Sequence, residues 1–528
     1  MKFIELLKRA DRYFDRQTPI LVLFLLILAL RLPNFFEPYW YGDEAIYLTL
    51  GTALREGGAL YTTIIDHKTP LIYYLAMVPN QFYFRLLNLV WMLVTTALFF
   101  KFAKTLFKKT IWAWLATLVM VLLTTLPWLE GHIPNGELFV MGFVMAGAIL
   151  FTKSDVWKLF FNTKKTTFVR NSRQKEICYL LSAGAFMGLG ILTKVPAILD
   201  VAAFLAIFWL ILAGQFFNPQ TKAKELGQTF TWLLKRGLIF MTGLLLPLLA
   251  SVVYFVAVGS GQDYLDYGLL YNFRYSQSWS LDLGNELLNF AFSMPGKTII
   301  LLIVVMLITL NVRKLKKRTQ FICLYFLFTL YSVLLSSRPY PHYFIQMVPA
   351  LALLLIDLLQ NWKEVKGTAL KIGLIAVTAY VMLSLGFKPY STGEYYKKFW
   401  QFATLKITQE EYENSFDSNV KDNREVSRLI HEMGVKKIFI WGTNPLLYAQ
   451  SKTVPTSRFT VAFHIKDFDD QARTFSQIER EEPKLIVVMK NERDSFPQLE
   501  AYLSKYYLPN TQFDRMVLYL RQELPEIK

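Results

Sequence analysis

Two adjacent carboxylates, Asp43 and Glu44, stand in the segment "WYGDEAIYLTLGTALREGG", just after the first hydrophobic stretch of the chain. A positioned carboxylate can take a proton from a hydroxyl nucleophile, which is general-base catalysis. The segment is apolar on one side and ends at Gly57-Gly58, a pattern that predicts a helix. In such a helix Asp43 could also be the N-cap, with Glu44 favourable to the helix dipole. The spacing alone leaves the catalytic and the capping interpretations equally open.

A second polar group interrupts the apolar stretch "IIDHKTPLIYYL", which contains Asp66, His67 and Lys68. Lys68 could pair with an anion, and His67 could exchange a proton or bind a metal ion. A surface loop whose charged side chains extend toward water is an equally supported alternative.

A third group lies in "EGHIPNGELF", where His132 and Glu137 offer an imidazole and a carboxylate. A hard divalent ion bound together with a phosphate would suit these ligands. The same segment also fits a helix start, with Asn135 as N-cap and Glu137 in the first turn. The helix-start interpretation is favoured, because nothing in the spacing is specific to a metal site.

The elements that must position these residues are membrane helices. Hydrophobic residues make up 54% of the 528 residues, which excludes an ordinary soluble domain. The apolar runs are continuous rather than alternating, so they predict helices and not a β-barrel. The chain has 57 Lys and Arg against 40 Asp and Glu. This excess lies in every second connection, as the positive-inside rule requires, and does not indicate nucleic acid. Cys178 and Cys323 imply no disulfide framework.

We expect about eleven membrane spans. They lie at roughly 18–35, 81–100, 111–129, 137–152, 177–193, 196–214, 237–258, 289–310, 320–336, 342–360 and 369–387. The cation-rich connections place the N-terminus in the cytoplasm. An odd number of spans then places everything after about residue 388 outside. No Ala-x-Ala-like site follows the first span, which is therefore interpreted as an uncleaved anchor.

The polar C-terminal part alternates helix-like segments with the short apolar strands "KKIFIWG", "KLIVVMK" and "FDRMVLYLR". This alternation predicts a small α/β domain. We therefore expect a transmembrane domain at 1–390, with a catalytic outer loop at 36–80, and an extracytoplasmic α/β domain at 391–528. "FIWGTNP" is a strand followed by a turn, a place where α/β folds bind ligands, although a plain structural role is favoured.

The expected outer face carries cations that the positive-inside rule disfavours there. They are Arg31, Lys68, Arg85, Lys194, Arg274 and Arg338, and His342 in "RPYPHYFIQMVPALALL" belongs to the same rim. For any one of them an ion pair is a sufficient explanation. Together they suggest a cationic basin that holds a phosphate at the outer leaflet.

The chain resembles the GT-C superfamily of polytopic glycosyltransferases, most of all the branch related to protein O-mannosyltransferases and lipid A aminoarabinose transferases. The resemblance is carried by "GDEAIY", "GGALYTTIIDHKTPLIYYL", "LTKVP" and "HYFIQMVPALALL", in this order, and it covers about residues 18–390. The chain departs from the family in two places. Lys68-Thr69-Pro70 stands where the family often has Lys-Pro-Pro, and His67 stands where aminoarabinose transferases carry a Glu.

The resemblance implies that a hexose or pentose is transferred, with inversion, from a polyprenyl-phosphate donor in the outer leaflet. Asp43 would be the catalytic carboxylate and Glu44 its supporting neighbour. The departing phosphate needs preorganised cations. The candidates are Lys68, Arg274, Arg338 and His342, followed by Arg85 and Lys194, and His67, His132 and Glu137 are candidates for an acceptor or a metal. We expect a plasma (inner) membrane protein whose partners are the donor lipid, membrane lipids and an unidentified glycan, lipid or protein acceptor. No cofactor is certain, and a divalent metal ion is left open.

A transporter or flippase of an anionic polyprenyl-linked lipid is the alternative. It would use the same cations, but its ionisable residues should lie near the membrane midplane and its halves should repeat. A sugar-binding scaffold with a decayed site is a third interpretation. The clustering of ionisable residues at one face and the intact Asp43-Glu44 pair favour the enzyme.

Overall fold

The computed structural model describes residues 18–161, 172–277 and 284–522, except residues 385, 388 and 469. The chain divides into two compact units. Unit 1 combines 1–32, 87–253 and 272–392, and unit 2 combines 33–86, 254–271 and 393–528. The boundary that we expected at residue 390 lies close to the division at 392. Segment 33–86, which contains the expected outer loop 36–80, and segment 254–271, however, belong to the unit of the C-terminal domain.

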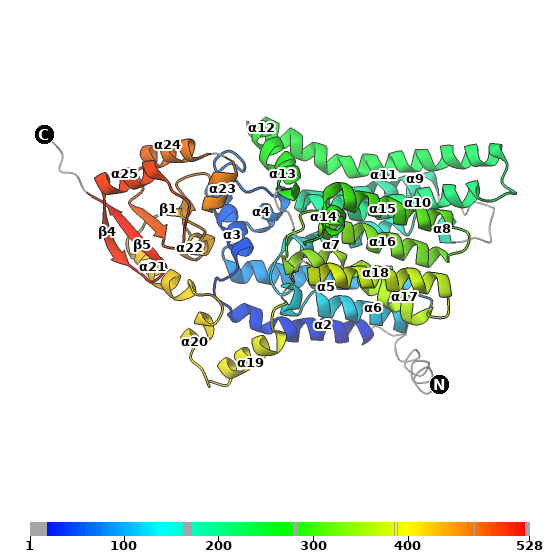
Figure 1. The fold of residues 1–528 in the computed structure, drawn as a ribbon, viewed down its shortest axis with the longest axis horizontal. Coiled ribbons are helices and arrows are strands. Elements are labelled where there is room, and N and C mark those ends of the chain that lie inside the picture. The colour runs from blue at the N-terminus through cyan, green and yellow to red at the C-terminus, as the bar shows by residue number, and fades with distance from the viewer. Residues whose placement is uncertain are drawn as a thin grey trace. The chain divides into compact units, whose positions relative to one another are not determined.

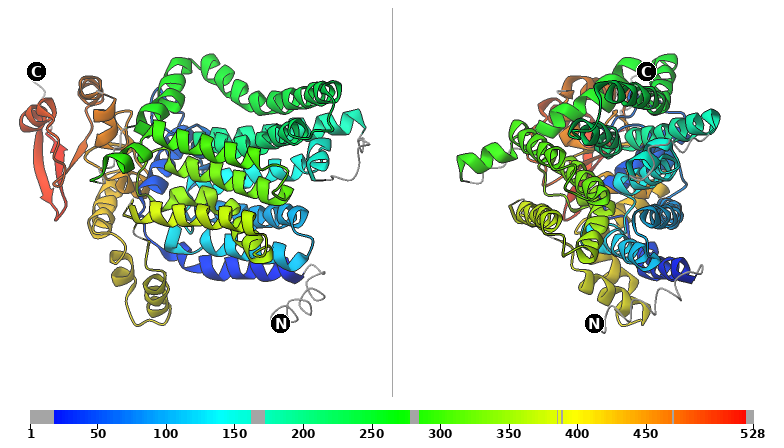
Figure 2. Two further views of the ribbon diagram at one scale, coloured as in Figure 1. Left: turned by 45° about the vertical axis from the view of Figure 1, so that its right-hand side comes forward. Right: turned by 90° about the vertical axis from the view of Figure 1, so that its right-hand side faces the viewer.

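Apolar helices dominate the fold, and Figure 2 shows those of unit 1 running side by side. Seven helical segments of the described residues are long and apolar enough to cross a membrane. They are α2 (Thr18–Arg31) with η1 (Leu32–Phe36), α5 (Gln81–Leu106), α9 (Arg173–Thr193), η3 (Val195–Ala197) with α10 (Ile198–Phe216), α11 (Ala223–Ala257), η5 (Pro341–Met347) with α17 (Val348–Gln360), and α18 (Val365–Ser384). The protein is therefore a multi-pass membrane protein, as the composition predicts.

Two further candidate spans are bent helix pairs. The pair α7 (Gly136–Phe151) and α8 (Asp155–Phe161) is bent by 78°, and the pair α14 (Glu286–Phe292) and α15 (Met294–Leu310) by 75°. If each pair is one span, the described residues contain nine candidates, fewer than the eleven expected.

The two remaining expected spans form helices that are either too short or not apolar enough to qualify as membrane spans. At 111–129 the helix is α6 (Thr110–Leu123), which has 14 residues. At 1.5 Å per residue it is about 21 Å long, shorter than the hydrocarbon core. It ends early because Pro127 follows and begins η2 (Pro127–Leu129). At 320–336 the helix is α16 (Lys317–Leu334), most of whose side chains are buried among other helices of unit 1.

Unit 2 contains a five-stranded sheet in the order β2-β1-β3-β5-β4. The strands are β1 (Lys437–Trp441), β2 (Val454–Pro455), β3 (Leu485–Met489), β4 (Tyr507–Gln512) and β5 (Met516–Arg521). The first three are parallel, and β5 pairs antiparallel with both β3 and β4. The α/β domain is confirmed, and β1, β3 and β5 are the three predicted strands. The short β2 and the polar β4 were not predicted.

Helices cover both faces of this sheet, as Figure 1 shows. On one face, α21 (Val420–Glu432) and α22 (Pro445–Ser451) pack on side chains such as Ile440 and Val487. On the other face, α23 (Ala462–Asp467), α24 (Gln471–Glu481) and α25 (Pro497–Tyr506) pack on Phe439 and Ile486. Alternate residues of each strand therefore point into two separate apolar cores.

Segment 33–86, which we call the first outer segment because it contains the expected outer loop, is built into the same unit. It forms α3 (Gly42–Arg55) and α4 (Leu71–Leu75), and α22 packs against α3. Ile65 forms a parallel bridge with Phe459 and joins the core cluster that contains Phe439.

The remaining helices of the described residues are α12 (Gly261–Asp263), η4 (Tyr264–Leu270), α13 (Tyr271–Gln277), α19 (Thr392–Ala403) and α20 (Gln409–Asn414).

The expected orientation can be tested by cysteine labelling. In a chain with Cys178 replaced by Ser, a cysteine at Glu425 should react with an impermeant reagent added outside, and one at Ser172 should not. Glu425 and Ser172 are both exposed, so accessibility alone does not separate them. Labelling of Ser172→Cys with protection of Glu425→Cys would reverse the orientation.

Candidate active site

Helix α3 determines where the two adjacent carboxylates point. The helix begins at Gly42 and its N-cap is Tyr41, with no side-chain capping hydrogen bond. The N-cap interpretation of Asp43 is therefore wrong, and Asp43 and Glu44 both lie within the first turn. Consecutive residues of an α-helix point about 100° apart, so the two side chains enter different surroundings.

Glu44 is buried and fully engaged, with 1% of its surface exposed. Arg85 donates to its two oxygens, from Nε to Oε1 and from Nη2 to Oε2, each over 2.8 Å. Gln81 Nε2 donates to Oε2 over 3.0 Å. Arg85 also pairs with Glu37 at 3.3 Å and donates to the carbonyl oxygen of Asn34. Glu44 thus attaches α3 to the beginning of α5. This ion pair explains the buried cation of Arg85, so no bound phosphate is needed to explain it.

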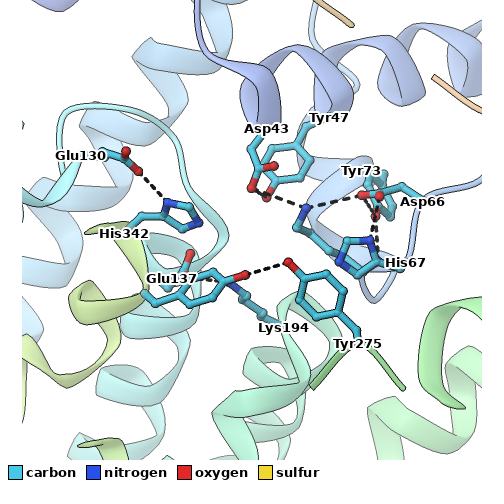
Figure 3. A network of polar contacts seen from close by, with 12 residues as sticks. Asp43, Tyr47, Asp66, His67, Tyr73, Glu130, Glu137, Lys194, Tyr275 and His342 are labelled. Atoms are coloured by element: carbon cyan, nitrogen blue, oxygen red, sulfur yellow. Dashed lines mark hydrogen bonds and ion pairs between the residues drawn. The ribbon is translucent and has the colours of Figure 1, made fainter. Parts of the chain in front are cut away.

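Asp43 lies in more open surroundings, with 27% of its side chain exposed. Tyr47 donates its hydroxyl proton to Asp43 Oδ2 over 3.2 Å from one turn further along α3. Lys68 Nζ lies 3.5 Å from the same oxygen and 5.0 Å from the centre of the Tyr47 ring. Figure 3 shows Asp43 and Tyr47 extending from α3 toward the loop that carries Asp66. The predicted base and the predicted phosphate ligand are therefore neighbours.

Asp66 is completely buried behind Lys68, whose Nζ lies 3.6 Å from Asp66 Oδ2. Tyr73 donates its hydroxyl proton to the same oxygen over 2.6 Å. Burial, the largest influence, would raise the pKa of Asp66. Lys68 and then the imidazoles of His67 and His464 outweigh burial and hold this pKa well below its ordinary value. Lys68 is therefore held between two carboxylates, Asp66 and Asp43.

The backbone of Lys68 is fixed by two tyrosines. Its N–H donates to the hydroxyl of Tyr73 over 3.1 Å, and its carbonyl oxygen accepts from Tyr61 over 2.7 Å. Tyr61 is fully buried against Phe255 and Tyr264. These contacts determine the position from which the ammonium group extends.

His464 on α23 completes this group, and the sequence analysis missed it. Its Nε2 lies 3.2 Å from His67 Nδ1 and 3.5 Å from Asp66 Oδ1. Burial lowers the pKa of His464 to about 3, so its imidazole is neutral at physiological pH. His464 lies 397 residues from His67, and no spacing rule connects two such positions. His464 follows β2, a strand that the sequence analysis did not predict, so no pattern in the sequence marked it.

The other predicted ligands belong to unit 1, where most of them have partners. Lys194 pairs with Glu137 and lies 4.3 Å from the ring centre of Tyr343. His342 Nδ1 lies 2.5 Å from Glu130 Oε2. Figure 3 draws both pairs. Asn135 is the N-cap residue of α7 with Glu137 in the first turn, as the favoured interpretation predicts, although its side chain makes no capping hydrogen bond.

Arg338 and Arg274 lie on the same unit. The Arg338 guanidinium lies 4.3 Å from the ring centre of Tyr275, and Arg274 is exposed on α13. Arg31, by contrast, is buried and donates to three carbonyl oxygens, those of Thr124, Gly131 and His132. His132 itself is 1% exposed. Arg31 therefore stabilises the loop that contains His132.

Comparison with known proteins gives a structural match. No family model and no curated protein matches the chain. The crystal structure of ArnT from Cupriavidus metallidurans in the apo state matches with a TM-score of 0.52 and 11% identity. The match covers 94% of this chain and 97% of ArnT. The chain has the fold of ArnT. The fold expected from the resemblance to GT-C glycosyltransferases is thereby confirmed.

Structures of an Archaeoglobus fulgidus oligosaccharyltransferase match more weakly than ArnT. One holds a tethered acceptor peptide, and its TM-score is 0.41 at 11% identity, over 97% of this chain and 75% of that chain. Another, named AglB, is in complex with an inhibitory peptide and a dolichol-phosphate, and also has a TM-score of 0.41, at 10% identity.

Removing Arg85 should destabilise unit 2 strongly. Arg85→Ala leaves the carboxylates of Glu37 and Glu44 buried without their cation, and breaking a buried ion pair costs about 3–5 kcal/mol. Thermal unfolding in detergent, followed by the loss of monodisperse protein, measures the effect. Arg274→Ala, at an exposed arginine, is the control and should unfold like the wild type. An Arg85→Ala chain as stable as this control would refute the role of the ion pair.

Proposed function

We propose that this chain is a membrane glycosyltransferase that uses a polyprenyl-phosphate-linked sugar and acts on the extracytoplasmic side, with Asp43 as general base. The observation that carries the proposal is the contrast between the two adjacent carboxylates. Glu44 is enclosed in an ion pair with Arg85, whereas Asp43 is partly exposed and faces Lys68 at 3.5 Å. The fold of ArnT and the resemblance to lipid A aminoarabinose transferases and protein O-mannosyltransferases support the same reaction class.

The proposed reaction is a single displacement at the anomeric carbon. Asp43 takes the proton of the acceptor hydroxyl while the acceptor oxygen forms its bond to this carbon. The bond between the carbon and the phosphate oxygen breaks, and the phosphate leaves with the electron pair. Because attack and departure occur on opposite faces, the configuration is inverted.

The surroundings of Asp43 suit this role. The ammonium group of Lys68 favours the ionised carboxylate, and the hydroxyl of Tyr47 fixes one of its oxygens. An ionised Asp in water is a weak base. Its basicity rises once a bound substrate excludes that water, because the charged form then loses solvation.

Lys68 is the proposed phosphate ligand in unit 2. Its distances to Asp43 and Asp66 are 3.5 and 3.6 Å, longer than the 2.7–2.9 Å typical of a charge-assisted hydrogen bond. A phosphate oxygen can therefore compete for the ammonium protons. The cation would then stabilise the charge that grows on the leaving group.

The proposed phosphate ligands of unit 1 are Arg274, Arg338, His342 and Lys194. Lys194 and His342 already pair with Glu137 and Glu130, so a phosphate would have to compete with a carboxylate at each of them. Arg85 is not included, because its guanidinium is 1% exposed and occupied by Glu37 and Glu44.

Asp43→Asn should fold and bind the donor but lose transfer. The amide preserves the shape and the contact with Tyr47, yet it cannot accept a proton. A general-base contribution is worth about two to four orders of magnitude, and turnover should fall by that factor. Transfer is measured in reconstituted membranes with a polyprenyl-phosphate sugar, and donor binding is measured separately.

Glu44→Gln is the matched comparison for Asp43→Asn. It should lower the unfolding temperature, since it weakens the pair with Arg85, and retain more turnover per folded molecule than Asp43→Asn. If Asp43→Asn keeps more than about a tenth of the wild-type turnover, Asp43 is not the base, because the expected loss is at least a hundredfold.

Lys68→Ala should weaken donor binding and slow transfer together, because the phosphate gains charge during the reaction. Loss of one charge-assisted hydrogen bond is worth about 1.5–3 kcal/mol, or roughly ten- to a hundredfold. KM for the donor and kcat are measured for Lys68→Ala and for Lys452→Ala, an exposed lysine of the same unit. Equal values of KM and kcat in the two variants would exclude Lys68 from the donor site.

A further inference from the structure

Three buried side chains of unit 2 bring metal-binding atoms together. Asp66 Oδ1 lies 3.1 Å from His67 Nδ1 and 3.5 Å from His464 Nε2, and the two imidazole nitrogens are 3.2 Å apart. The exposed fractions are 0% for Asp66, 8% for His67 and 1% for His464. The three atoms therefore form a nearly equilateral triangle shielded from water.

The size of this triangle fits a zinc ion. Tetrahedral zinc with bonds of about 2.0–2.1 Å separates neighbouring ligand atoms by roughly 3.3–3.4 Å. The observed separations of 3.1, 3.2 and 3.5 Å bracket this value. Two imidazoles with one carboxylate favour zinc over magnesium or calcium, which prefer oxygen ligands. Three protein ligands leave the fourth tetrahedral position for water or another oxygen ligand.

The surroundings of Asp66 Oδ1 also fit a cation. Within the described part of the chain, Asp66 Oδ1 is buried and has no donor with hydrogen-bonding geometry. The two imidazole nitrogens lie 3.1 and 3.5 Å from it, and a neutral imidazole carries one proton for its two nitrogens. A cation at the centre of the triangle would accept a lone pair from Asp66 Oδ1 and from each imidazole, in place of the hydrogen bond between His67 Nδ1 and His464 Nε2.

The surrounding structure holds the three ligands in place without a metal ion. The amide of Ile65, directly before Asp66, donates to the carbonyl oxygen of Arg458 over 2.7 Å. This bond ties the outer loop to the segment that leads into α23, which carries His464. The second oxygen of Asp66 accepts from Tyr73, which fixes the carboxylate in the way that outer hydrogen bonds orient metal ligands.

We propose that Asp66, His67 and His464 form a zinc site that joins the first outer segment to the C-terminal α/β domain. The site lies beside Lys68, because Asp66 presents one oxygen to the metal position and the other toward the ammonium group. Binding of zinc does not require the chain to be a glycosyltransferase, so the two proposals can fail separately.

Metal content tests the site directly. Full-length protein, purified in detergent through a tag without histidine, should retain about one zinc ion per chain, measured by elemental mass spectrometry. His464→Ala and His67→Ala should lose that zinc. His431→Ala, which removes an exposed histidine of the same unit, should retain it. Zinc retained in full by His464→Ala, or lost equally by His431→Ala, would overturn the assignment.

A second measurement uses only the wild-type chain and does not depend on how the variants fold. After removal of metal by a chelator, Co²⁺ should restore the unfolding temperature and give the visible absorption of a tetrahedral nitrogen–oxygen site. Added zinc should abolish that absorption. No change in unfolding temperature and no such absorption would show that the three side chains are a hydrogen-bonded cluster and not a metal site.

Discussion

The buried guanidinium of Arg85 is the constraint on which the outer segment depends. It bonds both oxygens of Glu44 and pairs with Glu37. Burying these charges is costly and is tolerated only when the geometry satisfies them. Once Glu44 is fixed, the rotation of α3 about its axis is fixed as well. Asp43, the preceding residue on the helix, then has to point elsewhere, and it faces Lys68. A structural ion pair thus determines which carboxylate is exposed.

The C-terminal domain contributes directly to this arrangement. Helix α22 packs against α3, and Ile65 pairs with Phe459. The chain therefore uses the α/β domain as a scaffold for residues of its first outer segment. This explains why Asp66 and His67, in the connection 56–70 between α3 and α4, form a defined cluster with His464. It also explains why 33–86 and the C-terminal domain form one compact unit.

The features that depend on residues close together in the sequence, namely strands and long apolar helices, were predicted from the sequence. Strands β1, β3 and β5 were predicted because their apolar runs are short and bounded by polar helices, and the long apolar helices were predicted from their length. The eleven expected spans exceed the nine candidates among the described residues because α6 has 14 residues and ends before Pro127, and because α16 is not apolar enough to qualify. The partners of the cations were not predictable, since Arg85 and Glu44 are 41 residues apart. Neither was His464, whose role arises only from tertiary packing.

Cleavage of a polyprenyl-phosphate sugar, rather than its movement across the membrane, distinguishes the proposed enzyme from a flippase. The most direct measurement reconstitutes the protein in liposomes with a polyprenyl-phosphate sugar and envelope lipids, and follows both lipids and glycosides by mass spectrometry and NMR. The expected result for a glycosyltransferase is the release of polyprenyl phosphate together with a new glycoside of inverted configuration. Donor that stays intact, or that only changes leaflet, would contradict it.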